Sequence, residues 1–373
     1  MPDIEALDGV AAGSIEAVNG VAKADIESIN GTGFAASGAT QWGVGLENGA
    51  LGYAASQDLT SWTTYYIGAS NESVDFVDMA YGTNGSGVNR WVIVWTKGSG
   101  EVKTTNDITS GSGGIGGANL DIKLRTVGYC NDTWVTMGQM KSGAQKMYTS
   151  LDGSTWTSRD LSGLSGIGTT DVYGIAHDGS GDHVVFTQDD SIYFSDDKGA
   201  TWAVGLAQID PSGSTAVGRH VVYLAGQSRF VVLYHKPNQG LKMVTAAASD
   251  LTTWSAPHDA DANLGNSLGS SAILRAVAAA GSTFVACYGA SHQRFTLSGS
   301  TITNGSYSNN SLPHGNVRDL GTDGTTWLAV HDDGDISVST NDGATFSSQA
   351  TGVQVANGVD DIECVAANVI LPV

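Results

Sequence analysis

The sequence predicts an all-β protein, a β-propeller of seven four-stranded blades behind a short N-terminal segment of different character. Fifty of the 373 residues are glycine and only six are proline, and Ser, Thr, Asn and Asp surround the glycines. Gly, Asn and Asp accept the backbone angles of tight turns, so this composition indicates many short strands. A turn motif recurs at about the length of a propeller blade. A sustained apolar stripe with helical period is absent from the sequence.

The recurring motif is Ser-x-Asp-x-Gly-x-Thr-Trp, with residues 195–202 as its clearest copy. Short acceptors at the Ser and Asp positions can bind backbone N–H groups, Gly permits a positive φ, and Trp packs into the blade. We therefore assign the motif a structural role as a strand connection. Its residues, copy by copy, are Ser56, Asp58 and Trp62; Asp107; Ser150, Asp152 and Trp156; Ser195, Asp197, Gly199 and Trp202; Asp250 and Trp254; Ser339, Asn341, Gly343 and Phe346.

The spacing of the motif gives the number of blades. The Asp-equivalent positions are 58, 107, 152, 197, 250 and 341, so the steps are 49, 45, 45, 53 and 91 residues. The last step spans two units, because residues 299–303 form a degenerate copy of the motif, without the Asp, between them. Seven units result, each close to the roughly 40–50 residues of a four-stranded blade.

The C-terminus is expected to close the ring. Residues 362–367 align with the first strand of the sixth unit, residues 274–279, yet no unit follows them. The first unit lacks a clear first strand, so the C-terminus is expected to supply it, which leaves no open sheet edge. In the alternative, residues 33–37 supply this strand and the C-terminus packs outside.

The N-terminal segment repeats with a period of 11, in residues 4–11, 15–22 and 26–32. Asp-Gly and Asn-Gly are strong hairpin signals, and a hairpin at Asn19-Gly20 would pair Val18 with Val21 and Glu16 with Lys23. Such short hairpins bury little surface, so they need a partner surface or other copies of the chain. We expect an attachment or oligomerisation segment at 1–33, a linker at 34–40 and the propeller at 41–373.

Composition also disfavours several partners. The net charge is −20 with only 17 Lys and Arg residues, which disfavours nucleic acid and anionic membranes, and no apolar run approaches the roughly 20 residues of a spanning helix. The acidic N-terminus has no apolar core, so we expect no cleavable signal peptide. Cys130, Cys287 and Cys364 are interpreted as buried small apolar residues, since three distant cysteines do not form a disulfide framework.

The motif residues quoted above resemble the Asp-box, or BNR, repeats of sialidases and related propellers over about residues 40–373. The Ile-Glu-x-Val-Asn-Gly-Val-Ala repeat is similar to N-terminal segments of tail and other virion proteins of bacteriophages, notably marine ones. Together the resemblances imply a virion structural protein, a tail, fibre or decoration component that is made in the host cytoplasm. Its implied partners are other virion proteins, bound through residues 1–33, and a host-surface glycan. The alternative is a glycan-binding or glycan-hydrolysing Asp-box propeller outside any virion.

The sialidase resemblance would imply an Arg-Ile-Pro motif, three arginines around a carboxylate and a Tyr–Glu pair. None of the eight arginines precedes Ile-Pro or Leu-Pro, and no Tyr–Glu pair can be assigned. We therefore expect a non-enzyme with no catalytic residues, and a glycoside hydrolase is the lower-ranked alternative.

The sequence also raises the hypothesis of an anion or glycan site at the channel of the propeller. Several guanidinium groups at one level could bind a carboxylate or another anion, such as an acidic glycan. In the alternative, each arginine pairs with a neighbouring acid, such as Asp171, Asp319 or Glu363. The four arginines share one place at the start of the inner strands of units 3, 5, 6 and 7: Arg125, Arg219, Arg275 and Arg318.

Cofactor and metal motifs are weak. Residues 111–116 match G-x-G-x-x-G, but no helix pattern follows them. Residues 259–263 have the spacing of a calcium loop without its distal Glu, and the eight histidines show no metal-ligand spacing. We expect neither a cofactor nor a metal.

Overall fold

The computed structural model describes the seven blades and parts of the N-terminal segment. The described residues are 6–7, 10–11, 17–18, 21–22, 28–29, 32–33, 40–46, 52–66, 76–95, 100–108, 116–139, 146–168, 170, 172–179, 181–209, 217–236, 240–260, 274–308, 311–349 and 362–368.

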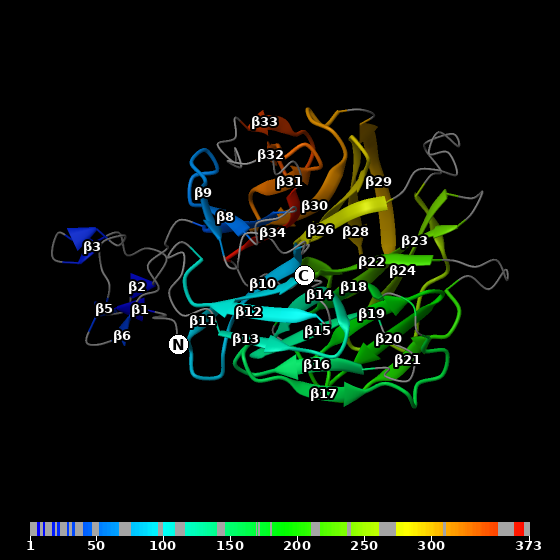
Figure 1. Cartoon of the computed structure of the whole chain (residues 1–373). Coiled ribbons are helices and arrows are strands. Elements are labelled where there is room, and N and C mark those ends of the chain that lie inside the picture. Colours follow the sequence, from blue (N-terminus) through cyan, green and yellow to red (C-terminus); the bar gives the residue numbers. More distant parts are fainter. Residues whose placement is uncertain are drawn as a thin grey trace.

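The protein is an all-β, seven-bladed propeller with four antiparallel strands in each blade, which confirms the predicted fold class. In Figure 1 the blades follow one another around the ring in the order of the colour bar. Blade 1 contains β34 (Ile362–Ala367), β7 (Trp42–Leu46), β8 (Gly52–Ser56) and β9 (Thr63–Tyr66). Blade 2 contains β10 (Phe76–Thr83), β11 (Asn89–Trp95), β12 (Glu101–Thr105) and β13 (Gly116–Asn119). Blade 3 contains β14 (Lys123–Cys130), β15 (Thr133–Gln139), β16 (Lys146–Ser150) and β17 (Thr157–Asp160). Blade 4 contains β18 (Val172–His177), β19 (Val184–Gln188), β20 (Ser191–Ser195) and β21 (Ala203–Leu206).

The remaining blades have the same order, with the innermost strand first. Blade 5 contains β22 (Val217–Leu224), β23 (Arg229–Lys236), β24 (Gly240–Ala247) and β25 (His258–Asp259). Blade 6 contains β26 (Leu274–Ala280), β27 (Thr283–Tyr288), β28 (Ser291–Ser298) and β29 (Thr301–Ser308). Blade 7 contains β30 (Val317–Thr322), β31 (Trp327–His331), β32 (Ile336–Ser339) and β33 (Ser347–Gln349).

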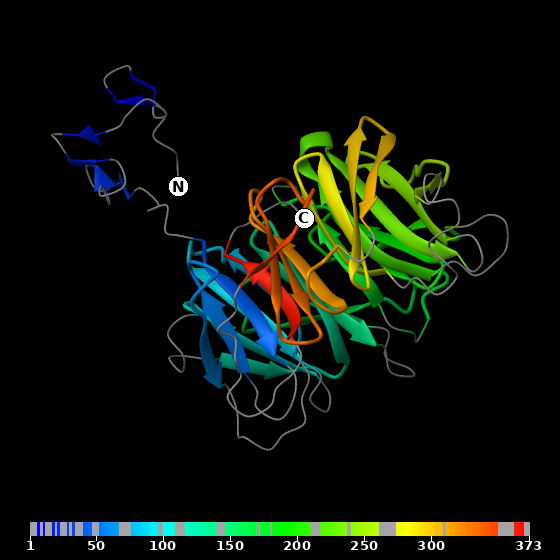
Figure 2. The ribbon, with the colours of Figure 1, turned by 90° about the horizontal axis from the view of Figure 1, so that it is seen from above.

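The C-terminal strand β34 closes the ring, as the sequence predicts. It is the innermost strand of blade 1 and pairs with β7 from Ile362 opposite Leu46 to Ala367 opposite Trp42. Figure 2 shows this red strand against the blue strands of the same blade. The alternative, in which residues 33–37 supply the strand, is wrong.

The apolar core lies between the blades. Seven clusters of buried residues are found among the described residues, and each spans two neighbouring blades. At the interface of blades 7 and 1, for example, Trp42 and Val44 pack with Leu328 and Val330. Because each blade buries both faces of its sheet, the ring forms one continuous core. The three cysteines are buried and free, as predicted.

Three two-stranded hairpins precede the ring, and none of their strands belongs to a blade. Val18 pairs with Val21, as predicted, whereas the Glu16–Lys23 pair lies outside the described residues. The hairpins are β1 (Ala6–Leu7) with β2 (Val10–Ala11), β3 (Ala17–Val18) with β4 (Val21–Ala22), and β5 (Ser28–Ile29) with β6 (Thr32–Gly33).

A short 3-10 turn, η3 (Ala225–Gln227), lies between β22 and β23. Within the described part of the chain, we find no helix of the length and apolar character that crossing a bilayer requires.

The order of the strands divides the ring into two faces. Innermost strands all begin at one face, and antiparallel pairing brings the turn between the second and third strands back to this face. The chain also passes from one blade to the next here, so we call it the link face. The Ser-Asp motif joins the third and fourth strands and therefore lies at the opposite face, which we call the turn face.

Candidate functional site

A β-bulge marks the start of every innermost strand. The pairing of each innermost strand with its neighbour skips one residue, at the same place in all seven blades. A bulge of this kind locally re-aims the side chain it carries. From blade 1 to blade 7, the skipped residues are Glu363, Val77, Arg125, Tyr173, Arg219, Arg275 and Arg318.

The four arginines named by the sequence analysis therefore occupy one equivalent position, near the link face. Arg125 and Arg275 are exposed and Arg318 is half-buried, while the side chain of Arg219 lies outside the described residues. The Nη1 atom of Arg318 lies 3.7 Å from Oε1 of Glu363 in the next blade. This ion pair agrees with the alternative in which each arginine pairs with a neighbouring acid. Asp171, another acid named there, lies outside the described residues.

The central channel contains a cavity of about 200 Å³, on the side of the bulges that faces the turn face. The residues that line it in the described part of the chain include none of the four arginines. They do include two carboxyl groups, Asp78 and Asp319, which directly follow the bulges of blades 2 and 7. The channel is therefore acidic at the position of these two groups, in contrast to the anion site hypothesised from the arginines.

Each of these carboxylates joins two neighbouring blades. Oδ2 of Asp78 accepts the N–H of Val127 at 2.9 Å and the hydroxyl of Thr126 at 2.9 Å, both in blade 3. Oδ2 of Asp319 accepts the N–H of Val365, in blade 1, at 2.9 Å. Val127 and Val365 occupy equivalent positions, each two residues after the bulged residue of its strand. The same hydrogen bond between neighbouring blades therefore occurs twice in the ring.

Burial raises the pKa of both carboxyl groups. Protein surrounds each group except toward the cavity, and this desolvation raises the pKa of Asp78 to about 6 although Val127 and Thr126 donate to it. Desolvation, together with the charge of Asp78, raises the pKa of Asp319 to about 7. Removing a carboxylate from water disfavours its charged form, and a second carboxylate adds to that effect.

The far end of the cavity, toward the turn face, is lined by Tyr81, Tyr129 and His177. His177 is only 7% exposed, and Nδ1 of its ring has no hydrogen-bond partner. Desolvation lowers the pKa of His177 to about 4, so the ring is neutral at physiological pH. An apolar level that includes Met79 and Leu320 separates this end from the two carboxyl groups.

At the turn face, the motif of blade 3 forms a compact network around one carboxylate. Oδ1 of Asp152 accepts the N–H groups of Ser154 at 2.7 Å and Thr155 at 2.6 Å. Gly153 has φ +72°, and the indole Nε1 of Trp156 donates to its carbonyl at 3.1 Å. The side chains thus satisfy the backbone groups of the turn, which is what a strand connection requires.

Other blades repeat this arrangement. The N–H groups of Ser61 and Thr60 donate to Asp58 and hold the pKa of that carboxyl well below its usual range. Phe346 cannot donate as Trp does, and its ring instead contacts the ring of His292 edge-on. The contacts in these blades are Ser195 Oγ with Gly199 N, Asp197 Oδ1 with Thr201 N, Trp202 Nε1 with Gly199 O, Ser339 Oγ with Gly343 N, Asn341 Oδ1 with Thr345 N, Ser56 Oγ with Leu59 N, Trp62 Nε1 with Leu59 O, Asp250 Oδ1 with Thr252 N, Trp254 Nε1 with Leu251 O, and Thr105 Oγ1 with Asp107 N. In blade 3, Ser150 Oγ accepts the N–H of Asp152 in the same way.

The weaker sequence motifs do not form a described site. The G-x-G-x-x-G match at 111–116 lies outside the described residues, except for Gly116 at the start of β13. In the segment 259–263, Asp259 forms an ion pair with Lys242 at 2.6 Å, and residues 261–263 lie outside the described part.

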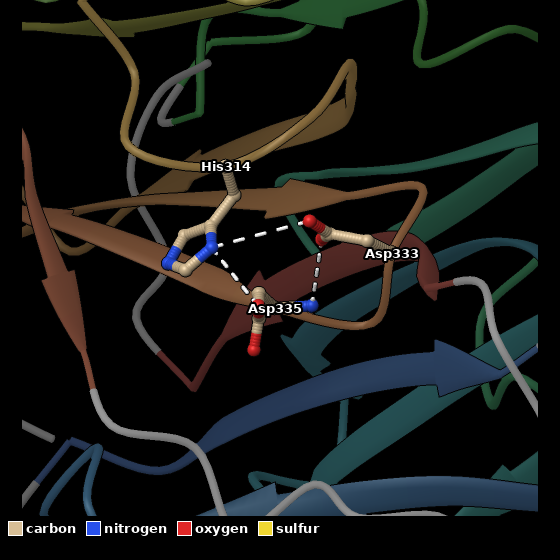
Figure 3. Close-up of side chains that lie close together, drawn as sticks. All are labelled: His314, Asp333 and Asp335. Atoms are coloured by element: carbon tan, nitrogen blue, oxygen red, sulfur yellow. Dashed lines mark hydrogen bonds and ion pairs between the residues drawn. The ribbon is translucent and has the colours of Figure 1, made fainter.

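One group of potential metal ligands was not anticipated from the sequence. His314, Asp333 and Asp335 each place one ligand atom within 4.8 Å of the others (Figure 3). His314 lies in the link from blade 6 to blade 7, whereas the two aspartates lie in the turn between the second and third strands of blade 7. Both segments belong to the link face. The spacing of possible ligands along the sequence does not reveal that the fold brings these two segments together.

The channel carboxylates were also missed, although the sequence carries a signal for them. Aligning Phe-Val-Asp-Met at Phe76 with Val-Arg-Asp-Leu at Val317 places Asp78 and Asp319 at one position of the repeat. That alignment requires the first strand of blade 2, which the sequence analysis does not delimit.

No family model and no curated protein sequence matches the chain. Solved structures do resemble it. A putative 6-phosphogluconolactonase from Bacteroides uniformis has a TM-score of 0.58 and 13% identity, covering 88% of this chain and 99% of its own. YCF48 bound to a D1 peptide has a TM-score of 0.56 and 12% identity, covering 86% and 91%. A chain of the mitotic checkpoint complex has a TM-score of 0.54 and 12% identity, covering 78% and 85%. At such identities the likeness establishes the propeller fold alone.

Proposed function

We propose that the chain is a bacteriophage virion structural protein, a tail, fibre or decoration component, whose residues 1–33 attach it to other virion proteins. One observation carries this proposal. Three hairpins of equal size follow one another at 11-residue intervals, and the seven blades are complete without any of their strands. The segment is therefore available for contacts outside the ring.

The size of the hairpins supports an attachment role. Each has two residue pairs, and a two-stranded hairpin is marginal in water without a surface to pack on. A threefold repeat suits a repetitive docking surface, such as the one that a symmetric assembly offers. The resemblance of the repeat to N-terminal segments of phage virion proteins points the same way.

The ring is proposed to contact a protein or a host-surface glycan through its link face. Arg125 and Arg275 are exposed there at equivalent bulge positions, so guanidinium groups recur around the mouth of the channel. Guanidinium groups bind carboxylates and other anions with paired hydrogen bonds, which favours an acidic sugar. The protein is proposed to bind such a ligand without hydrolysing it.

The geometry of the turns supports a second candidate function. The contacts of Asp152, Gly153 and Trp156 suit the Asp-box resemblance, and Asp-box propellers include glycan-binding and glycan-hydrolysing proteins. In this second proposal the chain is such a propeller and acts outside any virion.

Labelling of purified particles separates the two proposals. An antibody raised against the ring should decorate particles at a defined position in electron micrographs, and mass spectrometry of the same particles should detect peptides of the chain. A chain that is present in the infected-cell lysate and absent from washed particles would contradict the virion proposal.

A further inference from the structure

We propose that His314, Asp333 and Asp335 form a site for a divalent transition metal, with Zn²⁺ as the best fit. The site lies at the link face of blade 7, and it is independent of the arginines and of the N-terminal segment. One imidazole nitrogen and two carboxylate oxygens form its donor set. Zn²⁺ takes these donors in proteins, and a site with three protein ligands leaves a fourth position for water or for a ligand from a partner.

The distances between the donor atoms suit a small ion. Nδ1 of His314 lies 2.9 Å from Oδ2 of Asp335 and 4.0 Å from Oδ2 of Asp333. Ligand atoms at about 2.0–2.1 Å from a tetrahedral zinc ion are about 3.3 Å apart. Both separations are within about 0.7 Å of that value, and all three ligand atoms lie within 4.8 Å of one another.

A hydrogen bond at Nε2, the nitrogen that faces away from the two carboxylates, orients the ring of His314. Nε2 lies 2.8 Å from the hydroxyl of Ser348 in β33, and Nδ1 consequently points toward the two carboxylates, as Figure 3 shows. Metal-binding histidines typically hold a hydrogen bond of this kind on the nitrogen that does not bind the metal. Only 16% of the His314 side chain is exposed, so its orientation is fixed by packing as well.

The loop that carries the aspartates is held in a defined shape. Gly334 has φ +80°, which brings Asp333 and Asp335 to the same side of a tight turn. The N–H of Asp335 donates to Oδ1 of Asp333 at 3.1 Å. The backbone N–H next to His314, that of Gly315, donates to Oδ2 of Asp333 at 3.3 Å. Ligands from two separate segments are therefore held together before a metal binds.

Charge also favours a cation here. Asp332, Asp333 and Asp335 place three carboxyl groups within four residues, and Asn316 holds the first of them through its N–H and its side-chain amide at 2.9 Å and 2.8 Å. Crowded carboxylates repel one another, and a bound divalent ion is a strong local charge that offsets this repulsion. The imidazole favours a transition metal over Ca²⁺ and Mg²⁺, which prefer oxygen ligands.

Calorimetric titration of the full chain with Zn²⁺, and absorption spectra with Co²⁺ as a substitute, test the proposal. We expect one binding event and the intense visible bands of a tetrahedral Co²⁺ site. His314→Ala and Asp335→Asn should each weaken Zn²⁺ binding at least tenfold and abolish the Co²⁺ bands. Ca²⁺ and Mg²⁺ should bind at least tenfold more weakly than Zn²⁺.

Asp182→Asn is the matched control, because it removes an exposed carboxylate at the turn face, far from the three ligands. It should bind Zn²⁺ as the wild type does. The circular dichroism of every variant is compared with that of the wild type to show that it is folded, and Asp333→Asn replaces any variant that is not. Absence of Zn²⁺ binding by the wild type, or equal binding by the folded His314 and Asp335 variants, would overturn the proposal.

Discussion

The carboxylate of Asp319 in blade 7 accepts the N–H of Val365 in the C-terminal strand at 2.9 Å. This contact joins blade 7 to β34, the strand that completes blade 1 and closes the ring. Asp78 makes the equivalent contact with Val127 between blades 2 and 3. The same device therefore joins two pairs of neighbouring blades, and one of these pairs includes the blade that is built from both ends of the propeller.

Removal of residues 360–373 should strongly destabilise the ring. The truncation exposes the edge of β7 and removes buried side chains, Ile362 and Cys364 among them. Burial of a few such side chains contributes on the order of 5 kcal/mol, so the melting temperature should fall markedly. Calorimetry of the truncated and full-length chains measures this. Removal of residues 369–373 alone, beyond β34, is the control and should change little. Equal melting of the 360–373 truncation and the full chain would contradict closure by this strand.

The two channel carboxyl groups should make the protein less stable as the pH rises from 5 to 8, and the buried, neutral His177, whose pKa is lowered to about 4, should offset part of this loss. The folded state raises the pKa of Asp78 to about 6 and of Asp319 to about 7, whereas the ordinary value is 3.8. Folding therefore takes up protons, and this stabilising contribution is present at low pH and is lost as the pH rises through those two values. These two groups alone should make the free energy of unfolding on the order of 4 kcal/mol larger at pH 5 than at pH 8. Chemical denaturation at both pH values measures the difference.

The double variant Asp78→Asn, Asp319→Asn tests the origin of this pH dependence. It cannot ionise at either position, so its unfolding free energy should no longer fall from pH 5 to pH 8, and the opposite contribution of His177 should remain. Asp182→Asn, which changes a carboxylate at the turn face, should keep the fall. A double variant with the pH dependence of the wild type would show that other groups cause it.

The turn of blade 4 offers a matched pair of neighbouring aspartates. Asp197→Ala removes the acceptor of the Thr201 N–H and of the Thr201 and Ser195 hydroxyls, which should cost about 1–3 kcal/mol of unfolding free energy. Asp196→Ala removes an exposed carboxylate next to it and should change stability by less than about 0.5 kcal/mol. Denaturation curves of both variants measure this. Equal effects of the two changes would argue against a structural role for the motif.

The arginine proposal predicts binding of acidic glycans at the link face. Arg275→Ala combined with Arg318→Ala should abolish binding to acidic sugars on a glycan array and leave the fold intact. Arg159→Ala is a suitable control, because Arg159 donates to Thr149 within blade 3, away from the bulges. A wild type that binds no acidic glycan, or a double variant that binds equally well, would show that the arginines are structural. A fluorogenic sialoside should not be hydrolysed, and clear turnover would contradict the non-enzyme proposal.

The fold could be predicted because its signals are local. The Ser195 to Trp202 copy specifies its own turn through side-chain acceptors and a glycine, and regular repetition of such turns counts the blades. The closing strand could be predicted because it aligns with residues 274–279 and has no blade of its own. The candidate sites depend on relations between distant segments. His314 meets Asp333 and Asp335 only because two kinds of connection share one face, and the bulges that place the arginines depend on strand register.

The central proposal is that residues 1–33 attach the ring to a particle, and an incorporation assay tests it most directly. The full-length chain and a variant that begins at residue 34 are mixed separately with particles that lack the protein, and the bound amount is measured after washing. Both chains should show the circular dichroism of a folded propeller, since the blades are complete without the hairpins. Only the full-length chain is expected to be incorporated. Equal incorporation of the shortened chain would mean that the propeller itself makes the contacts, and the attachment role of residues 1–33 would be wrong.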